Sequence, residues 1–227
     1  MGVHRVPGAY GRTPGGQGDR FPGFDVLSQV QTWDMVTAGV VLARLGPPPP
    51  LRFFTLAEEA VGRALVDQLL DQRCEPRVPV LEMIDARLAE ARTDGWRYAD
   101  MPEDGQAWRD SLRALDGEAV ARFGRSLPDL DWAQQAGLLG AVQQSGEGLW
   151  HGMPAARVWS LWTRYAASAF YAHPWAWNEI GFGGPAYPRG YRGLGLDKRE
   201  PWEVVDAHPD RDPLRAAATG AGSPSRA

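Results

Sequence analysis

The sequence predicts an all-α protein: an irregular helical bundle followed by a long C-terminal arm rich in glycine, proline and aromatic residues. Apolar residues recur at helical spacing through the middle of the chain, whereas the alternation typical of strands is almost absent. The 27 glycines and 19 prolines of the 227 residues gather near the two ends and in one proline run. Because these residues interrupt helices, their positions separate a helical middle from irregular flanks.

The first helices are predicted between residues 33 and 91. Residues 33–45 place valines and leucines at helical spacing, and the Pro47–Pro50 run that follows is typical of a stiff polyproline connector. Thr55 and Glu58 have the spacing of a capping box, which indicates a second helix with one apolar stripe. Pro79 suits the first turn of a third helix.

Three further helices are predicted in the second half of the chain. Pro102 precedes a helix that we expect to end or kink at Asp116-Gly117, with a following turn closed by Gly124 as its C-cap. Asp131 is a candidate N-cap for the next helix. The last and most apolar helix is expected to begin at Pro154 and to stop before Pro174, because a residue that precedes proline disfavours the α conformation.

The predicted organisation is one helical domain with polar ends. Residues 21–205 form the domain, and residues 172–205 are its arm. Residues 1–20 and 206–227 are poor in large apolar side chains and are expected to be disordered tails.

Charge and composition exclude several classes of function. The net charge of −4 gives no basic footprint for nucleic acid. One cysteine and four scattered histidines provide no disulfide framework and no metal-ligand spacing, so no metal site is expected. The most apolar stretch, residues 36–45, contains Arg44 and is too short to span a membrane. No secretory signal is visible, so we expect the chain to be cytoplasmic or to be exported together with a partner.

No catalytic motif stands out. The sequence has no P-loop, no GxSxG elbow and no kinase signature, and the glycines of residues 181–184 lack the spacing of a dinucleotide fingerprint. Most acidic pairs lie at helix starts, where they favour the helix dipole. His151, His173 and Glu179 form one conceivable catalytic set, although no spacing between them requires it.

The arm carries the least ordinary composition in the chain. It combines ten glycines and prolines with aromatic and arginine side chains, the residue types that dominate protein–protein hot spots. The candidate partner-binding residues are Trp175, Trp177, Tyr187, Arg189, Tyr191 and Arg192. The alternative is that the arm wraps its own bundle, and the composition leaves both interpretations open.

The arm also carries a family resemblance. The string FYAHPWAWNEIGFGGPAYPRGY, which begins at Phe170, resembles the gluconate 2-dehydrogenase subunit 3 family. The stretches VPVLEMIDARLAE and DGWRYADMPEDGQAWRDSLRALD fit the same pattern, as does Phe53-Phe54-Thr55. The resemblance extends over roughly residues 24–206.

The resemblance implies an accessory role. Such subunits are helical and accompany a large FAD-dependent dehydrogenase of the glucose–methanol–choline type, often with a cytochrome c subunit. The large subunit holds FAD and oxidises a sugar, sugar acid or polyol, while the small subunit supports its assembly, stability or export. The family supplies no catalytic or cofactor-binding residues for this chain. Many members carry a twin-arginine signal, which is not found here.

The leading hypothesis is therefore a small subunit that binds no cofactor and is not catalytic alone. Two alternatives remain: a stand-alone helical scaffold, and a free enzyme that uses His151, His173 and Glu179.

Overall fold

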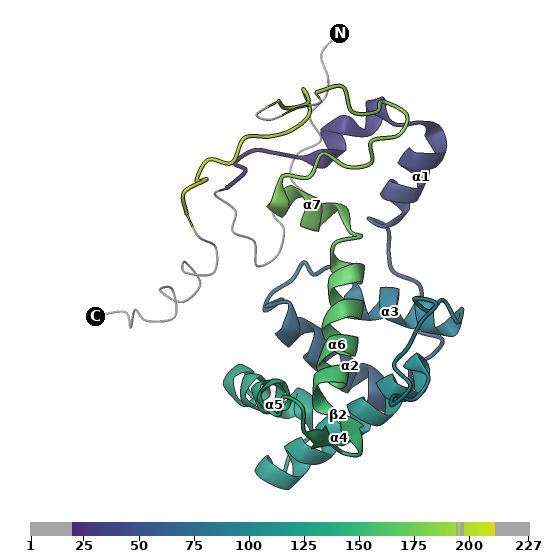
Figure 1. Ribbon diagram of the computed structural model, residues 1–227, viewed down its shortest axis with the longest axis vertical. Helices are drawn as coiled ribbons and strands as arrows, with labels where there is room; N and C mark the ends of the chain where they lie inside the picture. The colour runs from purple at the N-terminus through teal and green to yellow at the C-terminus, as the bar shows by residue number, and fades with distance from the viewer. Residues whose placement is uncertain (1–19, 194, 196–197, 212–227) are drawn as a thin grey trace, which may run out of the picture. The chain divides into compact units, whose positions relative to one another are not determined.

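The computed structural model describes residues 20–193, 195 and 198–211, and it confirms the all-α prediction. Helices dominate, and the described residues contain one two-stranded sheet (Figure 1). Contacts between Cα atoms divide the chain into two compact units. Residues 44–173 form the central unit, and the segments before and after it, residues 1–43 and 174–227, form the terminal unit.

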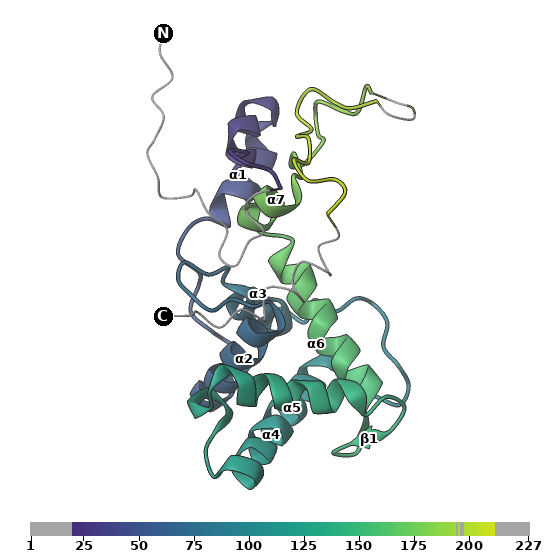
Figure 2. The ribbon, with the colours of Figure 1, turned by 90° about the vertical axis from the view of Figure 1, so that its left-hand side faces the viewer.

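The central unit is a bundle organised around one long apolar helix. Its helices are α2 (Leu56–Leu69), α3 (Val80–Ala89), α4 (Asp104–Phe123), α5 (Trp132–Gln144) and α6 (Ala155–Phe170). Helix α6 packs against each of the other four, as Figure 2 shows from the side. Three large side chains, Trp108, Trp162 and Tyr165, are fully buried between α4 and α6. The buried Trp162 indole N–H donates to Ser111 Oγ at 2.9 Å, which satisfies its polar group.

The helix ends of the central unit follow local chemistry that the sequence displays. The Thr55 hydroxyl accepts from the Glu58 amide while the Glu58 carboxylate accepts from the Thr55 amide, so the predicted capping box is confirmed. Asp131 forms a second capping box with Gln134. Gly124 ends α4 in the left-handed conformation with a φ of 69°, as expected for a C-cap.

Helix α4 continues past the point where the sequence predicted a break. Asp116 and Gly117 lie inside one helix of 20 residues, so the expected end or kink is wrong. The Asp116 carboxylate accepts from the Ser126 hydroxyl at 2.6 Å and the Leu127 amide at 2.8 Å instead of competing for its own helix. Leu115 and Ala119 are buried on either side of the glycine, so a continuous helix keeps both in the core.

A short hairpin joins α5 to α6, where no strand was predicted. Strands β1 (Leu149–Trp150) and β2 (Met153–Pro154) pair antiparallel. The turn between them places both central residues at positive φ, His151 at 48° and Gly152 at 82°. A 3₁₀ helix at Leu127–Asp129 precedes α5.

The terminal unit brings together segments that are far apart in the sequence. It contains a 3₁₀ helix (Val26–Thr32), α1 (Met35–Ala43) and α7 (Pro174–Ile180), and Figure 1 shows α7 beside the 3₁₀ helix. Its core consists of four buried side chains: Val26, Trp33, Val41 and Trp177. The sequence predicted no helix in this part of the arm, so α7 is a correction. Pro174 begins it, because proline fits the first helical turn.

The expected tails lie mostly outside the described residues. At their inner edges, Arg20 forms an ion pair with Asp206, and the Ala207 amide donates to the Arg20 carbonyl at 2.7 Å. The described end of the arm therefore returns to the start of the described chain.

Candidate partner interface

Two features fix the start of the arm within the terminal unit. The Asn178 side-chain carbonyl accepts from the Val26 amide at 2.8 Å, which ties α7 to the 3₁₀ helix. Gly184 has a φ of 76° and lies so close to the Trp33 ring that a Cβ atom there would overlap it. Position 184 therefore needs glycine, both for its backbone conformation and for the close approach of the backbone to Trp33.

The Arg189 side chain connects different parts of the arm through hydrogen bonds and a ring contact. Its Nη2 atom donates to the Gly183 carbonyl at 2.6 Å, and its Nη1 atom donates to Thr32 Oγ1 at 3.0 Å. The guanidinium carbon lies 4.2 Å from the centre of the Trp202 ring, in cation–π geometry. Burial lowers the pKa of Arg189 from its ordinary value. This arginine joins the early and late parts of the arm to the 3₁₀ helix.

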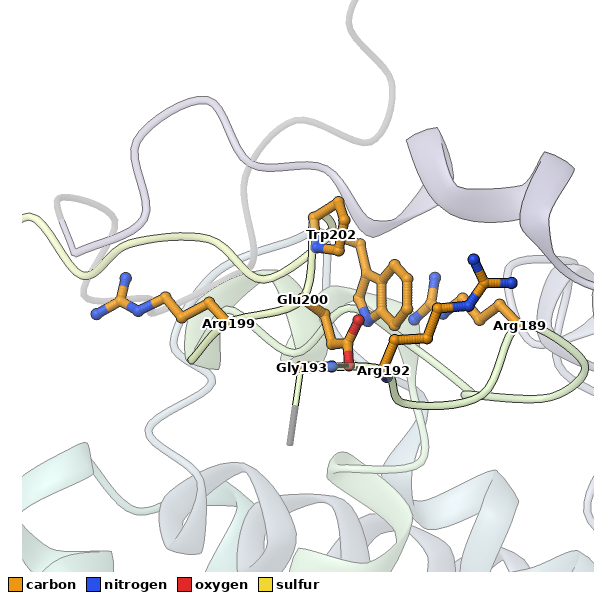
Figure 3. Close-up of a pocket in the computed structure, with 7 residues that line it drawn as sticks. Arg189, Arg192, Gly193, Arg199, Glu200 and Trp202 are labelled. Atoms are coloured by element: carbon orange, nitrogen blue, oxygen red, sulfur yellow. Dashed lines mark hydrogen bonds between the residues drawn. The ribbon is translucent and has the colours of Figure 1, made fainter. Parts of the chain in front are cut away.

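A cavity of about 470 Å³ lies beside this stacked pair (Figure 3). Its lining is cationic and aromatic: Arg189, Arg192, Gly193, Arg199, Glu200, Pro201 and Trp202. The one acidic side chain, Glu200, is buried, and its Oε1 atom accepts from the backbone amides of Arg192 and Gly193. In Figure 3, Arg199 extends to the opposite side of Trp202 from Arg189 and Arg192.

Several cationic side chains at or near this cavity differ from those of the central unit in their lack of partners. Three of them have neither a hydrogen bond nor an ion pair among residues 20–193, 195 and 198–211: Arg192, Lys198 and Arg199. Arginines of the central unit pair with carboxylates, for example Arg87 with Asp94 and Arg63 with Glu82. All three unpaired cations are exposed.

Helix α1 presents an apolar face to solvent. Its nine residues, MVTAGVVLA, contain no charged side chain. Met35 is 91% exposed and Val36 is 76% exposed, and Val40 lies on the same face one turn later. Val41, on the opposite face, is buried in the core of the terminal unit. An exposed apolar helix without charges is typical of a surface that another molecule covers.

The structure places the six predicted partner-binding residues in three different environments. Trp177 is 5% exposed and packs in the core of the terminal unit, and Arg189 is engaged as described above. Trp175 is partly buried. Tyr187 and Tyr191 are exposed, at 68% and 55%, and Arg192 is exposed beside them. Trp177 and Arg189 are therefore engaged within the chain, whereas partner binding by Tyr187, Tyr191 and Arg192 stays a prediction.

Sequence reasoning missed the apolar face of α1 and the cavity beside Trp202. The absence of charge in residues 35–43 was a visible signal for the first. Nothing in the sequence could indicate the second, because the cavity depends on how residues 189–202 fold back on themselves.

The proposed catalytic set is not brought together. His151 lies in the hairpin before α6, where its Nε2 atom is 3.1 Å from Glu118 Oε1. His173 follows the other end of α6 and donates from Nε2 to the Arg44 carbonyl at 2.9 Å. The 16 residues of α6 span about 24 Å, so the two imidazoles cannot act on one atom. Burial lowers the pKa of His173 to about 4 and raises that of Glu179 to about 7.

The residues that the structure describes contain neither a candidate metal-ligand cluster nor a helix that could cross a membrane. They contain no group of three or more His, Cys, Asp or Glu side chains suited to a metal ion. None of their helices is long and apolar enough to cross a membrane.

With this geometry established, comparison with known proteins identifies the family. The family model described as gluconate 2-dehydrogenase subunit 3 matches residues 57–184, which is more than half of the chain. The chain belongs to this family. The gluconate 2-dehydrogenase subunit 3 match covers α2 to α7 and ends before Tyr187, so α1 and most of the arm lie outside it. No curated protein and no solved structure matches the chain.

Proposed function

We propose that this chain is a non-catalytic accessory subunit of an FAD-dependent dehydrogenase that oxidises a sugar, sugar acid or polyol. Membership in a family of dehydrogenase subunits supports the existence of a partner. In this proposal FAD belongs to the large flavoprotein subunit, and the small subunit stabilises that subunit during assembly or export.

The observation that carries the proposal is the exposed, uncharged face of α1. Met35, Val36 and Val40 offer a contiguous apolar surface, and Tyr187 and Tyr191 add exposed aromatic side chains on the same unit. Tyrosines contribute large contact areas at interfaces with little loss of side-chain entropy. The terminal unit would therefore be the part that docks on the flavoprotein.

The test is co-expression with a large FAD-dependent dehydrogenase subunit, the flavoprotein of this proposal, followed by pull-down and measurement of bound FAD. We expect Val36→Asp/Val40→Asp to abolish recovery of the complex, because two charges would be desolvated at an apolar contact. A matched control, Leu56→Asp/Leu149→Asp, changes two exposed apolar residues of the central unit and should leave recovery unchanged. Equal recovery with both double variants would contradict the docking surface.

The arm is tested separately, with substitutions that spare the core. Deleting residues 174–204 would remove Trp177 and unfold the terminal unit, so Tyr187→Ala/Tyr191→Ala is the better variant. We expect it to weaken the complex by about tenfold or more, as for truncated aromatic anchors. An unchanged affinity would show that the arm has only an internal role.

A further inference from the structure

We propose that the cavity beside Trp202 binds an acidic segment of the partner protein, with Arg192 and Arg199 each pairing with a carboxylate. The inference deepens the docking function proposed above and rests on it, since it names the chemistry that the arm recognises.

Two arginines of the cavity lining and the nearby Lys198 have no ion-pair partner among the residues that the structure describes. The protein carries a net charge of −4, and its carboxylates pair with arginines throughout the central unit. Arg192, Lys198 and Arg199 have no such partner among the described residues. Unpaired guanidinium groups at a concave, partly apolar surface are sites of charge-assisted recognition.

Glu200 does not neutralise these cations from within. Its Oε1 atom accepts two hydrogen bonds from the Arg192 and Gly193 amides, and its side chain is buried. The carboxylate therefore fixes the turn at residues 192–193 and leaves the Arg192 side chain to project outward (Figure 3). Glu200 builds the site, and the arginines remain available for a ligand.

The arrangement of the arginines favours an extended acidic chain over one small anion. In Figure 3, Arg192 and Arg199 project on opposite sides of the Trp202 ring, an arrangement that favours two separate carboxylates over a single phosphate or carboxylate. Two carboxylates separated along a peptide can reach one arginine each and cover the indole between them. Tyr187 and Tyr191, which are exposed on the same segment, suit contact with the rest of such a peptide.

Nucleic acid is a poorer candidate for this surface. Its recognition requires an extended basic surface that contacts several phosphates, whereas three unpaired cations lie here on an acidic protein. An acidic protein segment requires no more than the two or three charges present. Complementary charge of this kind mainly raises the rate of association.

The first experiment measures the association rate with the flavoprotein by stopped flow, as a function of NaCl concentration. We expect Arg192→Glu/Arg199→Glu to slow association about tenfold at low salt, with the difference closing as salt screens the charges. The control is Arg113→Glu, which reverses an exposed arginine of α4. An association rate and salt dependence equal to those of the wild type would overturn the inference.

The second experiment tests the cavity without the flavoprotein. Side-chain Nε–H signals of ¹⁵N-labelled arginine are followed by NMR during titration with a hexaglutamate peptide, a DNA hexanucleotide or inorganic phosphate. Saturable shifts at Arg192 and Arg199 with hexaglutamate, and weaker ones with the other two probes, support the inference. Equal or stronger shifts with DNA or phosphate overturn it.

The two experiments separate the inference from the proposed function. Hexaglutamate binding together with failure of the flavoprotein to bind would leave the acidic-ligand site in place and remove the proposed partner. Flavoprotein binding that is insensitive to substitution of both arginines, with no hexaglutamate shift, would remove the acidic-ligand site and leave the proposed partner in place.

Discussion

His173 is held in a site that disfavours its charged form. It is fully buried, and its Nε2–H donates to the Arg44 carbonyl, an arrangement that suits the neutral ring. Because burial lowers its pKa to about 4, the unfolded chain binds more protons than the folded chain between pH 4 and 6.5. The contribution of His173 to stability is therefore complete above pH 6.5 and is lost as the pH falls through this window.

We predict that His173→Gln removes this dependence. The glutamine amide can still donate to the Arg44 carbonyl but cannot be protonated. Wild-type protein should lose on the order of 2 kcal/mol at pH 5 through His173, and the variant should lose nothing at this site. The measurement is the free energy of unfolding in urea at pH 8 and pH 5. The same loss between these pH values in both proteins would contradict the burial argument.

Glu179 has the opposite effect on stability. Burial raises its pKa to about 7, and its Oε1 atom is buried without a hydrogen-bond partner among the described residues. Between pH 4.5 and 7 the folded state binds more protons than the unfolded state, so stability falls as the pH rises through this window. The slopes due to Glu179 and His173 therefore oppose each other between pH 4.5 and 6.5.

We predict that Glu179→Gln stabilises the protein at pH 8 and has little effect at pH 4.5, because glutamine is neutral at both. In urea unfolding, the variant should have the higher midpoint at pH 8. The comparison with His173→Gln is the control, since that variant should show its largest gain relative to wild type at low pH. A lower midpoint for Glu179→Gln at pH 8 would mean that the carboxylate is charged and paired in solution.

At the scale of elements, the segment before α2 is fixed by α3 rather than by its own sequence. The buried Asp85 carboxylate accepts the backbone amides of Arg52, Phe53 and Phe54 at 2.7, 2.8 and 2.9 Å. These three bonds align the chain that leads into the Thr55 capping box. Arg109 adds a bond to the Phe53 carbonyl at 2.6 Å from α4.

We predict that Asp85→Ala destabilises the central unit by about 3 kcal/mol, because it leaves three amide donors without their charged acceptor. Thr55→Ala, which removes the cap alone, should cost about 1 kcal/mol. Both losses of unfolding free energy are to be measured by urea unfolding, followed by far-UV circular dichroism at pH 7. If the two variants lose equal stability, the three hydrogen bonds to Asp85 stabilise the central unit no more than the Thr55 cap does.

The sequence predicted helix starts better than helix continuity. Thr55 and Asp131 were identified correctly because a capping box is complete within four residues. The passage of α4 through Gly117 depends on the Ser126 hydroxyl, ten residues away from Asp116, and on core packing at Leu115. Helix α7 likewise depends on Val26, which lies more than 150 residues before Asn178.

The candidate interface likewise depends on contacts between residues that are distant in the sequence. Trp177 and Tyr187 belong to one aromatic-rich segment, and composition alone cannot separate the ring that fills a core from the ring that faces solvent. What separates them is contact with residues 26–41, which the chain reaches only by folding. Arg189 is committed in the same way, through Thr32. Arg192 differs because no carboxylate of the described chain pairs with its guanidinium group.

At the scale of the whole molecule, the features that indicate function are unevenly distributed between the two units. The family match covers most of the central unit, where most arginines pair with carboxylates. The exposed face of α1, the two exposed tyrosines and the unpaired cations all belong to the terminal unit. The family match therefore lies mainly on the central unit, whereas the proposed docking surface lies mainly outside the match.

Hydrogen–deuterium exchange of the complex with the flavoprotein tests this division directly. We predict that binding slows exchange in peptides covering residues 35–43 and 185–193, because their amides become shielded at the interface. Peptides of α5 should exchange at the same rate with and without the flavoprotein, and they are the internal control. The Arg192→Glu/Arg199→Glu variant should lose protection around residues 189–193 while retaining it on α1, since apolar burial there needs no charge. Protection confined to α4 and α5 would place the partner on the central unit and contradict the docking surface proposed for the terminal unit.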